Sequence, residues 1–99
     1  MKTIGIQGDI RIIKIDTLPK GAKKRLGNIL VEGESTGNAH RLVNGEVYEL
    51  EDRILFTIPF PTTIIHDEHE PIPLEMPGVY EIKRQREYTK DNMTRLVVD

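Results

Sequence analysis

Apolar and β-branched residues occur along this chain in short runs that are separated by Gly, Pro, Asn and Asp. The clearest run covers residues 10–15, where isoleucines are interleaved with Arg11 and Lys14 between Gly8 and Asp16. Short length, β-branched residues and flanking turn residues are typical of a β-strand. Because helical periodicity is almost absent from the chain, the pattern predicts an all-β protein.

Further runs of the same kind follow at a spacing that is typical of antiparallel strands. They cover residues 29–32, 38–43, 46–50, 54–58, 62–66 and 78–88. Residues 17–28 lose the alternation and contain Pro19 and two glycines, so they are predicted to form a loop. The sequence therefore predicts one β domain over residues 1–99. We expect a small barrel or sandwich of about seven antiparallel strands with little helix.

Turn signals divide these strands. Asn44-Gly45 predicts a hairpin that joins residues 38–43 to residues 46–50, because both central positions of a type I′ turn need positive φ. Glu51-Asp52-Arg53 predicts a second tight turn. Pro71 and Pro73 indicate an extended or turn backbone after His69 and exclude a helical metal motif there.

Length and composition narrow the class of protein. A chain of 99 residues fits a single domain with a small core. It has no cysteine, so a metal site would need nitrogen and oxygen ligands. The first residues lack the apolar core of a signal peptide, and no apolar run approaches the roughly 20 residues of a membrane span. We expect a soluble, cytoplasmic protein with no membrane partner.

Charge is segregated along the chain although the net charge is only −2. Residues 1–27 carry seven Lys or Arg against two acids, residues 28–81 carry two against eleven, and residues 82–99 carry five against three. Paired termini would give a basic side that could hold an anion or a nucleic-acid strand. Alternatively, opposite charges face each other across strands. The chain has only five Phe and Tyr residues and no Trp, which argues against a nucleic-acid surface that stacks bases on aromatic rings.

Strand alternation predicts which polar residues face inward. If Leu42 points to the core, period two places His40 and Asn38 on the same face. His66 shares its face with Ile64 in the same way. On the last strand, Tyr80 shares a face with Arg84 and Arg86 unless a bulge intervenes. These side chains would then converge in the mouth of the barrel.

A convergence of histidines would suit a divalent transition metal, because neutral imidazole is a good ligand and three protein ligands leave an open position. The oxygen ligand would come from Asp67, Glu68 or Glu70. Alternatively, His66 and His69 lie in a solvated acidic loop and His40 makes a hydrogen bond on a sheet surface. A nucleophilic role for Ser35, the only serine, is poorly supported because sequence spacing does not place a base beside it.

Four blocks of the sequence resemble a family of small uncharacterised bacterial and phage proteins. In that family the first block usually reads Gly-His-x-His and the second reads His-x-x-His before an Ile-x-Leu-Pro-x-Gly-x-Tyr strand. The corresponding blocks here are residues 33–42, 66–72, 76–82 and 85–88. A looser similarity links Asn38-Ala39-His40 and Glu46 to the first metal motif of cupins, whereas the second cupin motif is not matched.

The resemblance implies a cupin-like fold and metal ligands at His40, His66 and His69, with no assigned activity. The sequence departs from both patterns at Asn38, where a histidine would be expected, and an asparagine oxygen binds transition metals less well than imidazole.

We therefore expect a binding module with a weak or vestigial metal site at His40, His66, His69 and Asn38. Its mouth would bind a small anionic ligand through Arg84, Arg86 and Tyr80. One alternative is a metal-dependent enzyme that acts on a small anionic substrate. Another is a phage or host assembly protein, oligomeric with itself or bound to a protein partner through a sheet edge.

Overall fold

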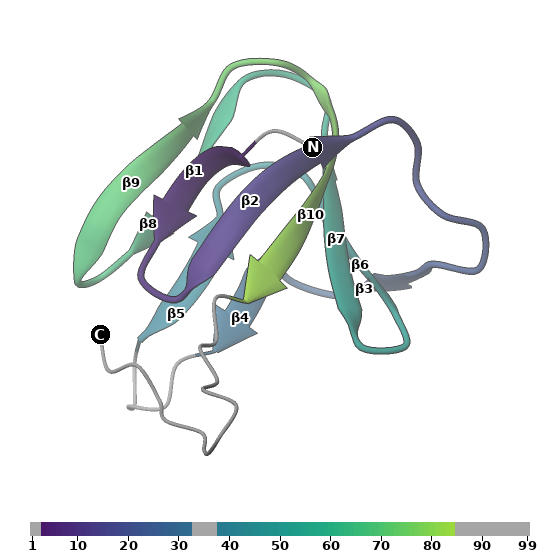
Figure 1. Cartoon of the computed structure of the whole chain (residues 1–99), viewed down its shortest axis with the longest axis horizontal. Helices are drawn as coiled ribbons and strands as arrows, with labels where there is room; N and C mark the ends of the chain where they lie inside the picture. The colour runs from purple at the N-terminus through teal and green to yellow at the C-terminus, as the bar shows by residue number, and fades with distance from the viewer. Residues whose placement is uncertain (1–2, 33–37, 85–99) are drawn as a thin grey trace, which may run out of the picture.

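The computed structural model describes residues 3–32 and 38–84. In these residues the chain forms ten β-strands in two antiparallel sheets and no helix (Figure 1). The predicted all-β sandwich is confirmed, but about seven strands was too low a number. No helix long and apolar enough to cross a membrane is found in the described part of the chain.

The larger sheet has six strands in the order β1-β2-β10-β7-β6-β3. It places the first and the last described strands on either side of β2, because β2 pairs with both β1 and β10. Its strands are β1 (Thr3–Gln7), β2 (Ile10–Ile15), β3 (Lys23–Arg25), β6 (Glu46–Leu50), β7 (Arg53–Ile58) and β10 (Gly78–Arg84).

The smaller sheet has four strands in the order β4-β5-β8-β9. These strands are β4 (Ile29–Glu32), β5 (Ala39–Leu42), β8 (Thr62–His66) and β9 (His69–Leu74). The edge strands β1 and β9 of the two sheets lie close together, and the chain of contacts between them closes one side of the sandwich (Figure 1).

Apolar side chains from both sheets fill the space between them. Ile10 and Phe56 of the larger sheet and Leu42 and Ile64 of the smaller sheet are completely buried. The Phe56 ring stacks on the ring of Tyr80 with 5.2 Å between centroids. The buried side chains of the two sheets therefore form a single core between them.

The predicted hairpin at Asn44-Gly45 is wrong. Strand β5 pairs with β4 and β8, whereas β6 pairs with β7 and β3, so these two residues carry the chain from one sheet to the other. Gly45 has φ +138° and Asn44 does not have positive φ, which excludes a type I′ turn. The second predicted turn is confirmed, because Leu50 pairs with Arg53 across Glu51 and Asp52.

Three strands were not predicted from the sequence: β1, β3 and β9. Each lies at the edge of its sheet. Strand β3 forms inside the segment that was predicted to be a loop, and its Lys23 and Lys24 pair with Glu49 and Tyr48 of β6. Strand β9 accommodates Pro71 and Pro73 because an edge strand has one side on which no backbone donor is needed.

Candidate functional site

The three histidines of the chain lie together at one end of the sandwich. The ring centroids of His40 and His66 are 4.4 Å apart, those of His66 and His69 are 4.6 Å apart, and those of His40 and His69 are 6.5 Å apart. His40 is buried with 3% of its surface exposed, His66 is half-buried, and His69 is exposed. The cluster therefore runs from the core to the surface.

Strand pairing explains why the rings meet. His66 and His69 are directly paired residues at the end of the β8–β9 hairpin, separated by the two-residue turn Asp67-Glu68. Strand β5 pairs with β8 through Arg41 and Ile65, which places His40 beside His66 on the adjacent strand. Two residues that are paired across antiparallel strands project to the same face of the sheet.

A buried glutamine from the other sheet holds the inner ring. Gln7, at the end of β1, donates from Nε2 to the carbonyl oxygens of Glu70 at 2.8 Å and Ile64 at 3.2 Å. Its Oε1 atom lies 2.8 Å from Nδ1 of His40. Because the amide nitrogen faces two carbonyl oxygens, Oε1 is an acceptor and Nδ1 of His40 must carry the proton. Neutral His40 therefore presents an unprotonated Nε2 atom.

The turn between β1 and β2 approaches the same cluster. Asp9 Oδ1 lies 3.7 Å from His40 Nε2. Gly8 has φ +60°, and a Cβ atom at this position would lie 2.8 Å from His69 Nε2. The lack of a side chain at Gly8 thus allows the His69 ring to rest against the turn. Figure 1 shows this turn and the β8–β9 hairpin at the same end of the molecule.

Burial sets the charge of the inner imidazole. Burial, and after it the neighbouring His66, lowers the pKa of His40 to about 4, while Asp9 acts in the opposite direction. Because the ordinary pKa of histidine is about 6.5, His40 is neutral at neutral pH.

His66 is oriented by its own turn. Its Nδ1 atom accepts a hydrogen bond of 3.0 Å from the backbone N–H of Glu68, so neutral His66 carries its proton on Nε2. In the side-chain conformations seen here, no three imidazoles or carboxylates of residues 3–32 and 38–84 form a ready ligand set for a metal ion.

The other predicted metal ligand, Asn38, lies just before β5 and is half-buried. The side chains of Asp67, Glu68 and Glu70, the predicted oxygen donors, are on exposed residues of the β8–β9 hairpin. Glu68 and Glu70 take part in the site through backbone atoms instead, as the donor to His66 and an acceptor for Gln7.

The residues predicted to form an anion-binding mouth are separated. Tyr80 is 1% exposed, and its hydroxyl donates to the backbone carbonyl of Met76, so its ring is packed in the core rather than on an open mouth. Arg84 is exposed at the end of β10 and lines a hollow with Arg25. Arg25 donates to the carbonyl oxygens of Ile29 and Leu30. Arg86 lies outside the described residues.

Charge segregation along the sequence is used for pairing between strands. Lys24 Nζ lies 3.1 Å from Glu46 Oε2, which joins the basic strand β3 to the acidic strand β6. Arg53 donates from Nε and Nη2 to both carboxylate oxygens of Glu81 at 2.9 Å. This hydrogen bonding lowers the pKa of the buried Glu81 carboxyl. The alternative of opposite charges facing each other across strands therefore describes these residues.

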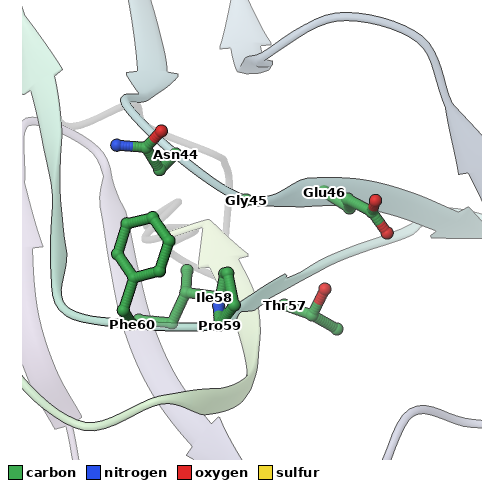
Figure 2. Close-up of a pocket in the computed structure, with 7 residues that line it drawn as sticks. All are labelled: Asn44, Gly45, Glu46, Thr57, Ile58, Pro59 and Phe60. Carbon is green, nitrogen blue, oxygen red and sulfur yellow. The ribbon is translucent and has the colours of Figure 1, made fainter.

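A second hollow lies where the chain crosses between the sheets, and no histidine lines it. Figure 2 shows the exposed ring of Phe60 beside Asn44, with the Glu46 and Thr57 side chains farther along the hollow. It is also lined by Gly45, Ile58 and Pro59. None of the predicted site residues lines it.

Sequence reasoning missed Gln7 and Asp9. Two signals were available in the sequence: a polar residue, Gln7, at the end of a short segment with alternating isoleucines, and a Gly-Asp pair directly after it that is typical of a turn. Neither signal indicates a contact with His40, which is 33 positions from Gln7 in the sequence.

A family model for a domain of unknown function, DUF8820, matches residues 6–85 of the chain. The match includes Gln7, Asp9 and the three histidines. No curated protein and no solved structure matches the chain.

Proposed function

Because the chain belongs to the DUF8820 family, a domain of unknown function, we propose its function from the site: it is a binding module that holds a divalent transition metal at its histidine cluster. The ligands are the imidazoles of His40, His66 and His69. The observation that carries this proposal is the gathering of the three rings at one end of the sandwich.

The spacing of the rings supports this proposal. Metal–nitrogen bonds of about 2 Å and tetrahedral angles place the centroids of two ligating imidazoles roughly 5 Å apart. The three centroid distances of 4.4, 4.6 and 6.5 Å bracket that value. To bring three nitrogen atoms to one ion, the rings must change orientation and the His40 and His69 centroids must approach each other by roughly 1.5 Å.

The state of the nitrogen atoms also supports it. His40 already presents Nε2 without a proton, because Nδ1 donates to Gln7. His66 must give up its contact with the Glu68 N–H before it ligates, because its Nδ1 atom either binds the metal itself or takes the proton that Nε2 releases. Since His66 is half-buried and His69 is exposed, both rings have room to rotate.

Metal analysis of the full chain, purified without a histidine tag, tests the proposal. We expect about one equivalent of zinc or another divalent transition metal per chain, and calorimetric titration of the chelator-treated protein with Zn²⁺ should show one site. His69→Gln should weaken this binding at least about tenfold, since one of the three imidazoles that bind the metal directly is lost.

Two further variants keep the test decisive. His40→Gln should also lose binding, while circular dichroism shows whether this buried substitution preserves the fold. Asp52→Asn, in the exposed β6–β7 turn, is the control and should bind as the wild type does. Absence of binding by the wild type, or equal binding by wild type and His69→Gln, would overturn the proposal.

The anion-binding mouth, the metal-dependent enzyme and the assembly protein stay predictions from the sequence. One observation bears on the anion-binding mouth. Arg84 pairs with Ile10 in the β2–β10 ladder, and Ile10 directly follows Asp9, so Arg84 lies at the histidine end of the larger sheet.

A further inference from the structure

We propose that Asp9, in the β1–β2 turn, supplies a carboxylate oxygen to the metal and makes the site a three-histidine, one-aspartate centre. This inference rests on the proposed function and names a ligand that neither the sequence pattern nor the family match indicates. It also replaces Asp67, Glu68 and Glu70, the acids nearest to the histidines in the sequence, as the source of the oxygen.

Two hydrogen-bond acceptors, Nε2 of His40 and the carboxylate of Asp9, face each other. Gln7 fixes the Nδ1–H of His40, so the Nε2 atom that faces Asp9 carries a lone pair. The Asp9 carboxylate is also an acceptor. Two such atoms at 3.7 Å from each other repel unless a cation or a proton donor lies between them.

The distance between His40 Nε2 and Asp9 Oδ1 fits two ligands of one metal ion. Two ligand atoms that are each about 2 Å from a tetrahedral metal are roughly 3.4 Å apart. The observed separation between His40 Nε2 and Asp9 Oδ1, 3.7 Å, is close to this value. Only a small movement of Asp9, whose side chain is 54% exposed, is needed to reach it.

The ring of His69 also approaches the β1–β2 turn. Its Nε2 atom lies where a Cβ of residue 8 would be 2.8 Å away, directly before Asp9 in the sequence. The β1–β2 turn is therefore in contact with the outermost histidine as well as with the innermost one.

This arrangement gives the metal a structural consequence. Asp9 belongs to the hairpin of the six-stranded sheet, whereas all three histidines belong to the four-stranded sheet. A metal bound by both would link the sheets across the β1 and β9 edges, where Gln7 already forms the described side-chain link. Metal binding is therefore expected to raise the melting temperature of the protein.

Titration of the metal-free full chain with Co²⁺ tests the assignment, because the visible absorption of Co²⁺ reports the ligand set and calorimetry reports the affinity. Asp9→Asn preserves the shape of the side chain and removes its charge. We expect it to raise the Co²⁺ dissociation constant roughly tenfold or more and to change the absorption spectrum. The matched control Asp67→Asn, on the β8–β9 turn, should leave both unchanged, as should Asp52→Asn.

The outcomes separate this inference from the function on which it rests. If wild type binds Co²⁺ and His69→Gln loses it, while Asp9→Asn binds with the wild-type constant and spectrum, the aspartate assignment is wrong and the histidine site stands. The assignment is equally wrong if Asp67→Asn is the variant that weakens binding. If the wild type does not bind, the histidine site fails first. Circular dichroism of Asp9→Asn verifies that an exposed substitution has not altered the fold.

Discussion

Gln7 and His40 are joined by a buried hydrogen bond of 2.8 Å between Oε1 and Nδ1, although 33 positions separate them in the sequence. The same Gln7 side chain donates to two backbone carbonyl oxygens of β8 and β9. One amide therefore satisfies three polar groups, links the two sheets and selects the tautomer of the imidazole.

Replacement of this glutamine should destabilise the fold. Gln7→Leu leaves the Nδ1–H of His40 without its acceptor and the two carbonyl oxygens without this donor, so we expect a loss of about 3 kcal/mol in the free energy of unfolding. Urea denaturation measures it. Ile6→Ala, at the exposed neighbouring position of β1, is the control and should change stability by less than about 0.5 kcal/mol. Equal effects of the two substitutions would contradict the role of Gln7.

The stability of the metal-free protein should depend on the protonation of His40. Its folded-state pKa of about 4 is below the ordinary value, so the unfolded chain binds the proton more readily. Stability is thus fully present above about pH 6.5 and is lost as the pH falls towards 4, by an amount on the order of 3 kcal/mol. Urea denaturation between pH 7.5 and pH 4 in the presence of a chelator measures this loss.

The variant His40→Gln isolates that contribution, because Glu81 and the other carboxyls titrate in both proteins. The difference in unfolding free energy between wild type and variant should shrink as the pH falls from about 6.5 to about 4. A constant difference over this range would show that the imidazole is not held neutral.

Core strands could be predicted from the sequence because burial on one face leaves a period-two pattern. The three strands that were missed, β1, β3 and β9, are all at sheet edges. An edge strand is covered less, so its composition is constrained less: β3 is Lys23-Lys24-Arg25, and β9 contains Pro71 and Pro73. Pairing with a neighbour, rather than local pattern, makes these segments extended.

The site was partly readable for the same reason. Alternation places His40 and His66 on the inward faces of their strands, and a two-residue turn between His66 and His69 puts these two residues opposite each other. Asn44-Gly45 misled because a local turn preference does not specify which sheet the next strand joins. Gln7 and Asp9 reach the histidines only through the pairing of distant strands, which single-sequence patterns do not encode.

Removal of Arg53 should make the stability of the protein less dependent on pH in the acid range. The guanidinium forms a bidentate pair with Glu81, whose carboxylate is nearly buried and whose pKa is lowered mainly by this hydrogen bonding. Lowering of the folded-state pKa gives stability that is present above the ordinary value and lost below it. Arg53→Ala should therefore lose more stability at pH 7 than at pH 3, and NMR should show the pKa of Glu81 moving upward.

The double variant Arg53→Leu with Glu81→Leu is the control for this pair. Because it leaves no unpaired buried charge, its loss of stability at pH 7 should be smaller than the sum of the losses caused by Arg53→Leu alone and Glu81→Leu alone. Additive losses would mean that the two side chains act independently.

Substitution of Gly45 should disrupt the crossing between the sheets. A Cβ atom here would clash with the carbonyl oxygen of Thr57 and lie 2.7 Å from a methyl group of Leu42, at φ +138°. Gly45→Ala should therefore cost about 2 kcal/mol or more in urea denaturation. Gly27→Ala is the matched control, because Gly27 also has positive φ but no atom within 4 Å of the added Cβ. It should carry only the backbone penalty of roughly 1 kcal/mol. Equal costs would place Gly45 in an open turn, which is what the hairpin prediction required.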